Sequence, residues 1–201
     1  MSSVSDLNHE SNIDRVISYW FAGPDAHKKW FGGGPSVDAE IKDQFSPLVL
    51  AARSSQLESW RGKPDGELAL VLLLDQFPRN IFRGTPESFS SDSMALEVST
   101  EAIAKGLHRQ VPHGQEMFFY YPFMHDEKLI SHVADVALWE LWKGRCEGSA
   151  EMERAEESLS FARRHMETIV RFGRYPSRNK ILGRESTEEE VKFLEEKPSG
   201  F

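Results

Sequence analysis

The stretch LALVLLLDQFPRNIFRGTPESFSSDSMAL, residues 68–96, decides the fold of this chain. Its first seven residues, Leu68–Leu74, are apolar on every side, which predicts a helix in the core rather than on the surface. A polar cluster follows directly and consists of Asp75, Gln76, Arg79 and Asn80. Pro78 lacks the backbone donor that a continuing helix needs, so we expect the helix to end near Phe77. The buried helix therefore brings an acid, an arginine and an amide to one place.

The composition is that of a soluble globular protein. The chain has 201 residues, 39% of them hydrophobic and 28% charged, with a formal net charge of -8. This length is enough for one domain with a substantial core. The acidic balance argues against nucleic acid as a partner, because non-specific binding to nucleic acid needs clustered positive charge.

Cysteine content and hydropathy exclude further classes of protein. The single cysteine, Cys146, excludes an intramolecular disulfide and a cysteine-rich metal site. The first twenty residues contain no apolar segment of signal-peptide length, and no apolar run reaches membrane-spanning length. We therefore expect a soluble cytoplasmic protein with no membrane partner. The sequence does not determine the oligomeric state.

Helical spacing of apolar residues extends along most of the chain, and no alternating β-type pattern occurs. Helices are expected over residues 12–20, 36–60, 87–105, 126–142 and 151–172, and after the capping-box sequence at 186–190. The fold class that follows is all-α. We expect a disordered polar arm at residues 1–10 and a single multi-helix domain at residues 11–201.

The chain contains a second segment whose sequence is similar to that of the polar cluster. Phe77-Pro78-Arg79-Asn80 is matched by Tyr175-Pro176-Ser177-Arg178-Asn179, and each segment follows an apolar helix. Arginine at such a place can cap the free carbonyl groups of the helix end, which would be a structural role. Alternatively, two arginines and two amides bind a carboxylate or phosphate together. In that case Arg79 and Arg178 should point into a shared polar cavity.

Three motifs resemble a known family. They are LLLDQFPRNIFRGT at residues 72–85, YPFMH at 121–125 and RFGRYPSRNKILGREST at 171–187. Together they resemble the bacterial domain-of-unknown-function family 924, over nearly the whole chain from Ile13 to Leu194. The resemblance implies an all-helical domain of the tetratricopeptide-like class, a right-handed helical array. It implies no activity.

Two ionisable residues are candidates for catalysis, Asp75 and His125. A buried acid must be paired or hydrogen-bonded, and Arg79 is a natural partner four residues on, so a structural salt bridge is an equally good interpretation of Asp75. His125 follows an aromatic segment and precedes Asp126 and Glu127, which we expect to begin the next helix. It could exchange a proton near neutral pH, or it could fix the turn through a hydrogen bond to a loop carbonyl.

The other histidines give weaker signals. His132 and Asp135 are three residues apart and could ligate a metal, but seven histidines produce such spacings by chance. His165 lies beside two arginines on a charged helix, where we expect it to be exposed. We therefore expect no metal and no cofactor.

Two functional hypotheses remain. In the first, a polar pocket binds an anionic small molecule and supports acid/base chemistry. Its catalytic candidates are Asp75 and His125, and its ligand-binding candidates are Arg79, Asn80, Tyr121, Arg174, Arg178 and Asn179. The second is a non-catalytic helical-repeat scaffold that binds a peptide or partner protein. Enclosure of the polar groups would favour the first hypothesis, and an open apolar groove would favour the second. Whether the protein is an enzyme stays open at this point.

Overall fold

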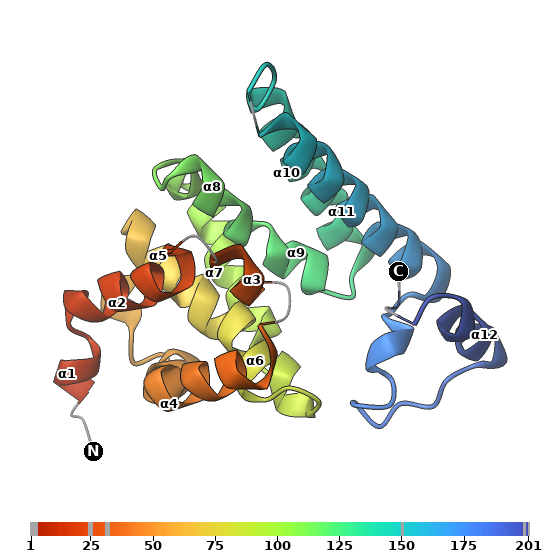
Figure 1. The fold of residues 1–201 in the computed structure, drawn as a ribbon, viewed down its shortest axis with the longest axis horizontal. Coiled ribbons are helices and arrows are strands. Elements are labelled where there is room, and N and C mark those ends of the chain that lie inside the picture. The colour runs from red at the N-terminus through yellow and green to blue at the C-terminus, as the bar shows by residue number, and fades with distance from the viewer. Residues whose placement is uncertain (1–3, 24–25, 31–32, 150, 199, 201) are drawn as a thin grey trace. The chain divides into compact units, whose positions relative to one another are not determined.

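A computed structural model of the chain describes residues 4–23, 26–30, 33–149, 151–198 and 200 (Figure 1). Every regular element in this part of the chain is a helix and none is a strand, which confirms the predicted all-α class. The chain divides into two compact units, Met1–Pro122 and Phe123–Phe201, and each is described by itself. A single domain over residues 11–201 and a right-handed tetratricopeptide-like array stay predictions.

The first unit is built from short and medium helices. Its elements are α1 (Val4–Leu7), α2 (Glu10–Phe21), α3 (Ala26–Trp30), α4 (Gly34–Arg53), η1 (Glu58–Trp60), α5 (Pro64–Val71), η2 (Leu72–Gln76), α6 (Phe77–Ile81), η3 (Pro86–Phe89), α7 (Asp92–Ala104), η4 (Leu107–Arg109), α8 (His113–Glu116) and η5 (Met117–Phe119). The boundary between the units falls inside α9 (Tyr121–His125).

The segment predicted to be a disordered arm contains a helix. Val4–Leu7 form α1, and Asn8 attaches the segment to the rest of the unit. The side-chain amide of Asn8 donates to the carbonyl of Gln56 at 2.6 Å, and the indole N–H of Trp60 donates to the carbonyl of Asn8 at 3.2 Å. Residues 1–3 of the predicted arm lie outside the described residues.

The central helix of the first unit does not end at Phe77, so that prediction is wrong. The residues from Leu68 to Phe77 are all buried, as expected, but α5 continues through a π-helical turn, η2, into α6. In this wider turn the N–H of Phe77 donates to the carbonyl of Leu72, five residues back. Pro78 therefore sits at the start of α6, where a helix tolerates a missing N–H.

A side chain from a later segment compensates for Pro78. Because Pro78 has no N–H, the carbonyl of Leu74 loses the donor that an α-helix would supply. The hydroxyl of Ser91 donates to that carbonyl at 2.7 Å, and the Nε–H of Arg53 donates to the same hydroxyl at 3.2 Å. Ser91 is buried immediately before α7. The helix therefore continues beyond Pro78 because a residue from another segment binds the carbonyl group that Pro78 leaves free.

Aromatic rings hold α2 and α4 against the central helix. The ring of Phe77 lies 5.3 Å from that of Trp20 and 4.9 Å from that of Phe45, between centroids. All three side chains are fully buried. Tilted contacts of this kind contribute beyond the area that they bury, so these rings fix the two helices on the core.

The second unit is organised around an antiparallel pair of long helices (Figure 1). Its elements are the end of α9, α10 (Leu129–Arg145), α11 (Met152–Phe172), η6 (Pro176–Arg178) and α12 (Glu188–Glu196). The helices α10 and α11 pack along their lengths. Their buried stripes are apolar near the connecting loop, with Trp139 and Trp142 on α10, and polar at the other end, with His132 on α10 and His165 on α11.

The last helix begins as the sequence predicts. Thr187 is the N-cap of α12, its hydroxyl accepts from the N–H of Glu190, and the carboxylate of Glu190 accepts from the N–H of Thr187. This reciprocal capping box satisfies two of the donors that a helix start leaves free. Among the helices that the structure describes, none is long and apolar enough to cross a membrane.

Candidate functional site

Asp75 is held by a closed set of partners in the first unit. Its side chain is completely buried, and Arg79 Nη1 lies 3.1 Å from Oδ1 while Gln76 Nε2 donates to Oδ2 at 2.5 Å. Arg79 also donates to both carboxylate oxygens of Asp92, at 2.9 and 3.0 Å. The predicted ion pair between Asp75 and Arg79 is therefore confirmed. The bidentate contact to Asp92 gives this arginine a structural role.

Asn80 and Tyr121 are also built into the first unit. Asn80 is buried, its amide donates to the carbonyl of Gln76 at 3.1 Å, and its side-chain oxygen accepts from Arg83 at 3.1 Å. Tyr121 is 9% exposed, and its ring meets that of Phe118 edge-on at 5.3 Å. Both side chains support the packing of the unit.

In the second unit, Arg174 and Asn179 converge on the capping-box glutamate. Arg174 donates to both carboxylate oxygens of Glu190, at 2.6 and 2.8 Å, and to the carbonyl of Glu185 at 2.9 Å. The amide of Asn179 donates to Glu190 at 3.2 Å and to the hydroxyl of Ser186 at 3.0 Å. The hydrogen bonds from Arg174 lower the pKa of Glu190 to about 2. These contacts attach α12 to the loop before it.

A second ion pair, absent from the candidates named from sequence, fixes the same loop. Arg184 donates to both oxygens of Glu127, at 2.6 and 3.0 Å, and to Asn179 Oδ1 at 2.9 Å. Glu127 also accepts from the N–H of Tyr175 at 2.8 Å. Burial opposes ionisation of Glu127, but the hydrogen bonds outweigh it and lower its pKa. Arg184 belongs to the third family-like motif, which was the available signal.

Tyr175 forms the centre of the polar end of the helix pair. It is buried, and its hydroxyl donates to the carbonyl of Met124 at 2.5 Å. The imidazole rings of His132 and His165 meet its ring edge-on, with centroids at 5.9 and 5.7 Å. The guanidinium of Arg178 covers the ring, with Cζ 4.6 Å from the centroid. These side chains, with His125, are called the Tyr175 cluster below.

Hydrogen bonds set the tautomers of the two buried histidines. Nε2 of His132 lies 2.7 Å from the carbonyl oxygen of Asp126, and Nδ1 of His165 lies 2.8 Å from that of Phe161. Since a carbonyl oxygen only accepts, each of these ring nitrogens must carry the proton. Nδ1 of His132 is then an acceptor, and it is buried without a hydrogen-bond partner among the described residues.

Burial keeps both histidines neutral. It lowers the pKa of His165 to about 3 and lowers that of His132 as well. Repulsion by the neighbouring cationic groups acts in the same direction, because His125 and Arg178 lower the pKa of both residues. Hydrogen bonds to backbone carbonyls oppose these effects without reversing them. The cluster thus disfavours positive charge on both buried imidazoles.

The structure corrects two predictions in this region. His165 was expected to be exposed on a charged helix, but it is 5% exposed because Tyr175 covers it from the following loop. Asp126 was expected to begin the next helix, but α10 begins at Leu129. His125 is the last residue of α9 and is half-buried. The carbonyl of Asp126 binds His132 instead, and its carboxylate accepts from Ser131 at 2.5 Å.

Asp135 is a buried acid near the polar end of α10. It is completely buried, and neither carboxylate oxygen has a well-formed hydrogen bond to any described residue. Burial raises its pKa well above the ordinary value, and the indole N–H of Trp139, one turn later, opposes this only in part. A buried carboxyl group without a cation is expected to stay protonated. The spacing of Asp135 from His132 predicts only a metal ligand, not a buried neutral acid.

The structure thus places the candidates named from sequence in two groups. Asp75, Arg79, Asn80 and Tyr121 belong to the first unit, and His125, Arg174, Arg178 and Asn179 belong to the second. Each unit brings its own members together. The convergence of Arg79 with Arg178 in one cavity stays a prediction.

Comparison with known proteins supports the resemblance seen in the motifs. The family model described as a bacterial protein of unknown function (DUF924) matches residues 16–198. The chain belongs to this family. The solved structure of a protein of unknown function, ATU0120 from Agrobacterium tumefaciens, is similar, with 36% sequence identity and a TM-score of 0.77. The match covers 93% of this chain and 98% of that one. No curated protein matches the chain.

The chemistry of this DUF924 chain therefore has to be argued from its own side chains. The first-unit residues Asp75 and Arg79 satisfy each other and Asp92, so their geometry serves stability. The Tyr175 cluster offers imidazole nitrogens and a guanidinium at one place, groups that exchange protons and bind anions.

We expect Asp75→Ala to lower the free energy of unfolding by about 1–3 kcal/mol. The substitution removes the charge-assisted hydrogen bonds of a buried carboxylate and leaves the side-chain amide of Gln76 without that acceptor, whereas Arg79 keeps its contact to Asp92. Chemical denaturation measures this effect. Asp43→Ala, at an exposed position on α4, is the control and should change stability by less than about 0.5 kcal/mol. An unfolding midpoint of Asp75→Ala equal to that of the unsubstituted protein would contradict the structural role.

The low pKa of His165 predicts a pH dependence of stability. Its pKa is about 3 in the folded chain, against an ordinary value of 6.5. Between these values the unfolded chain binds a proton that the folded chain does not, so stability falls as the pH is lowered through this range. The loss at pH 5 relative to pH 7 should be about 2 kcal/mol.

His165→Gln should remove that contribution and flatten the pH dependence of the unfolding free energy between pH 7 and pH 5. His27→Gln, at an exposed position on α3, is the control and should keep the original pH dependence. Guanidinium titrations at each pH give the comparison. The same slope in His165→Gln as in the unsubstituted protein would show that His165 titrates normally.

Proposed function

We propose that the protein binds an anionic small molecule at the Tyr175 cluster of its second unit, with His125 as the group that exchanges a proton with the ligand. The observation that carries this proposal is the grouping of His132, His165 and Arg178 around the ring of Tyr175. His125 and Arg178 both act to lower the pKa of the two buried imidazoles, so added positive charge is unfavourable there. An anion at this place would reverse the repulsion. It would stabilise the protonated form of each imidazole and so favour its own binding.

The side chains differ in what they can contribute. His132 and His165 are buried and held by backbone carbonyls, so they shape the site from within. His125 and Arg178 are half-buried and can meet a ligand from solvent. Arginine binds carboxylate and phosphate through paired N–H groups, and histidine ordinarily titrates near neutral pH. Arg178 is therefore assigned to holding the anion and His125 to moving the proton.

The binding of a partner helix is a second candidate function. Apolar side chains on the outer surface of α10 support it, because Ile130, Val133 and Leu141 are 72%, 52% and 56% exposed. Their spacing places them on one stripe of the helix, as in the face that an amphipathic partner helix covers. This surface would serve the scaffold hypothesis, whereas the Tyr175 cluster serves the small-molecule hypothesis.

A ligand screen tests the first proposal. Phosphate and small mono- and dicarboxylates should raise the melting temperature, because a ligand that binds only the folded state stabilises it. Uncharged amides of the same acids are the negative controls. For the best anion, Arg178→Gln should weaken binding about tenfold or more in calorimetry, since a charge-assisted contact is lost. Arg163→Gln, which removes an exposed arginine of α11, should leave the affinity unchanged.

His125→Gln separates binding from catalysis. With an anion that the protein turns over, this variant should keep the fold and the affinity while turnover falls by about 10²–10⁴. Equal turnover in the variant would remove His125 from the chemistry. A panel in which no anion shifts the melting temperature, or in which the amides shift it equally, would contradict an anion site.

A further inference from the structure

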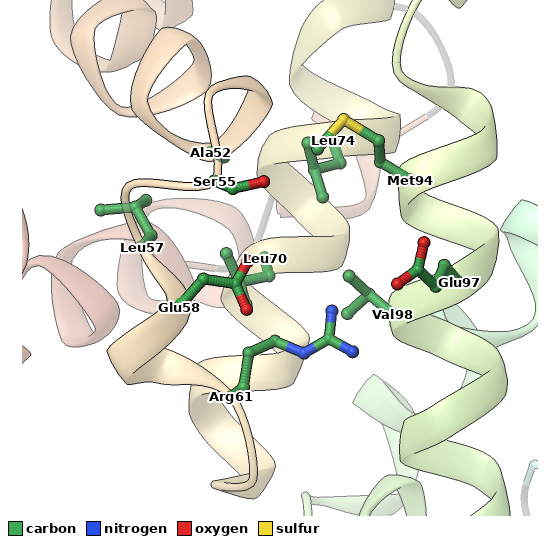
Figure 2. Close-up of a pocket in the computed structure, with 10 residues that line it drawn as sticks. All are labelled: Ala52, Ser55, Leu57, Glu58, Arg61, Leu70, Leu74, Met94, Glu97 and Val98. Atoms are coloured by element: carbon green, nitrogen blue, oxygen red, sulfur yellow. The ribbon is translucent and has the colours of Figure 1, made fainter.

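The first unit contains a small pocket with a mixed lining (Figure 2). It lies where the end of α4, the turn before η1, the central helix and α7 approach one another, and its volume is about 80 Å³. The lining residues are Ala52, Ser55, Leu57, Glu58, Arg61, Leu70, Leu74, Met94, Glu97 and Val98. The Tyr175 cluster belongs to the other unit, so the pocket is a separate feature.

The inner surface of the pocket is apolar. Ala52, Leu57, Leu70, Leu74 and Val98 are each less than 5% exposed, so the pocket rests on the buried core of the unit. A cavity lined in this way gives water few hydrogen-bond partners. An aliphatic group would gain free energy by entering it, because apolar surface leaves water on both sides.

Acidic groups dominate the rim. Figure 2 shows the side chains of Glu58, Arg61 and Glu97 around the same opening. Arg61 is already paired twice, since its Nε lies 3.3 Å from Glu67 and its Nη2 lies 3.1 Å from Glu101. The carboxylates of Glu58 and Glu97 make no hydrogen bond or ion pair with any described residue. The rim therefore presents two uncommitted negative charges and a neutralised arginine.

The size of the pocket limits which ligands can enter it. An engineered apolar cavity of about 150 Å³ holds benzene, so about half that volume accommodates a short unbranched chain rather than a ring. The hydroxyl of Ser55 faces the pocket in Figure 2 and adds a neutral acceptor near the rim. An aliphatic stem of about four carbons with a cationic end matches both the apolar interior and the acidic rim.

We infer that this pocket binds a primary alkylammonium group, with the aliphatic stem against Leu57, Leu70 and Leu74 and the ammonium at Glu58 and Glu97. The group can come from a free alkylamine or from the side chain of a lysine in a peptide. Both sources present the same stem and charge. An ammonium donates three hydrogen bonds, and two carboxylates with a hydroxyl supply three acceptors.

Titration of the full chain with n-butylammonium tests the inference by NMR. Saturable shifts of amides around the pocket are expected, with a Kd of about 1–10 mM, as suits a ligand of five heavy atoms. 1-Butanol tests the stem without the charge, and butyrate tests it with the opposite charge. Both should bind about tenfold more weakly or not measurably, because neither satisfies the acidic rim.

Two substitutions at exposed positions test the rim without disturbing the core. Glu58→Gln and Glu97→Gln should each weaken n-butylammonium binding about threefold to tenfold, and the double variant should weaken it further. Asp43→Asn, an exposed acid on α4, is the control and should leave the affinity unchanged. Added salt should also weaken binding, because an exposed rim is screened.

A second probe, N-acetyl-lysine N-methylamide, distinguishes a lysine side chain from a free alkylamine as the source of the ammonium group. Binding of this probe at the affinity of n-butylammonium supports lysine side chains as ligands, and exclusion of the probe supports free amines. Equal binding of 1-butanol and n-butylammonium, or affinity unchanged by loss of both glutamates, would overturn the inference. Absence of saturable shifts with n-butylammonium would overturn it as well.

Discussion

A polar group buried between these helices needs a partner inside the protein, because water is excluded and an unpaired group there is costly. Most of the buried polar groups meet this constraint with neighbours that fix the course of the chain. Asp75 is bound by Gln76 and Arg79 in the central helix. The carbonyl of Leu74, which Pro78 leaves free, is bound by Ser91. These contacts determine where the central helix runs and how α7 approaches it.

Exceptions to the constraint occur in both units, and those with ionisable side chains in the second unit lie on α10. Nδ1 of His132 and both carboxylate oxygens of Asp135 are buried without well-formed hydrogen bonds to any described residue. Burial lowers the pKa of His132 and raises that of Asp135, so both residues are kept neutral. Their effects on stability oppose each other as the pH falls, since the histidine loses stability where the acid gains it. Groups held against their ordinary charge are typical of functional sites.

Sequence reasoning succeeded where the interaction is local. Asp75 and Arg79 are four residues apart on one helix, and Thr187 and Glu190 form a capping box within a single turn, so spacing alone predicts both contacts. It failed where the deciding partner comes from another segment. Local sequence predicts that Pro78 ends the helix, because it does not show that Ser91 supplies the missing donor. His165 was expected to be exposed because no local pattern shows that Tyr175 covers it.

The charge states within the Tyr175 cluster are the central claim, and histidine ring NMR over a pH series measures them. We expect His165 to stay neutral to well below pH 5, with its proton on Nδ1. We expect His132 to be neutral at pH 7, with its proton on Nε2. Saturation with the best anion should shift the titration of His125 to higher pH. Ordinary titration of all three rings near pH 6.5, unchanged by any anion, would contradict the account.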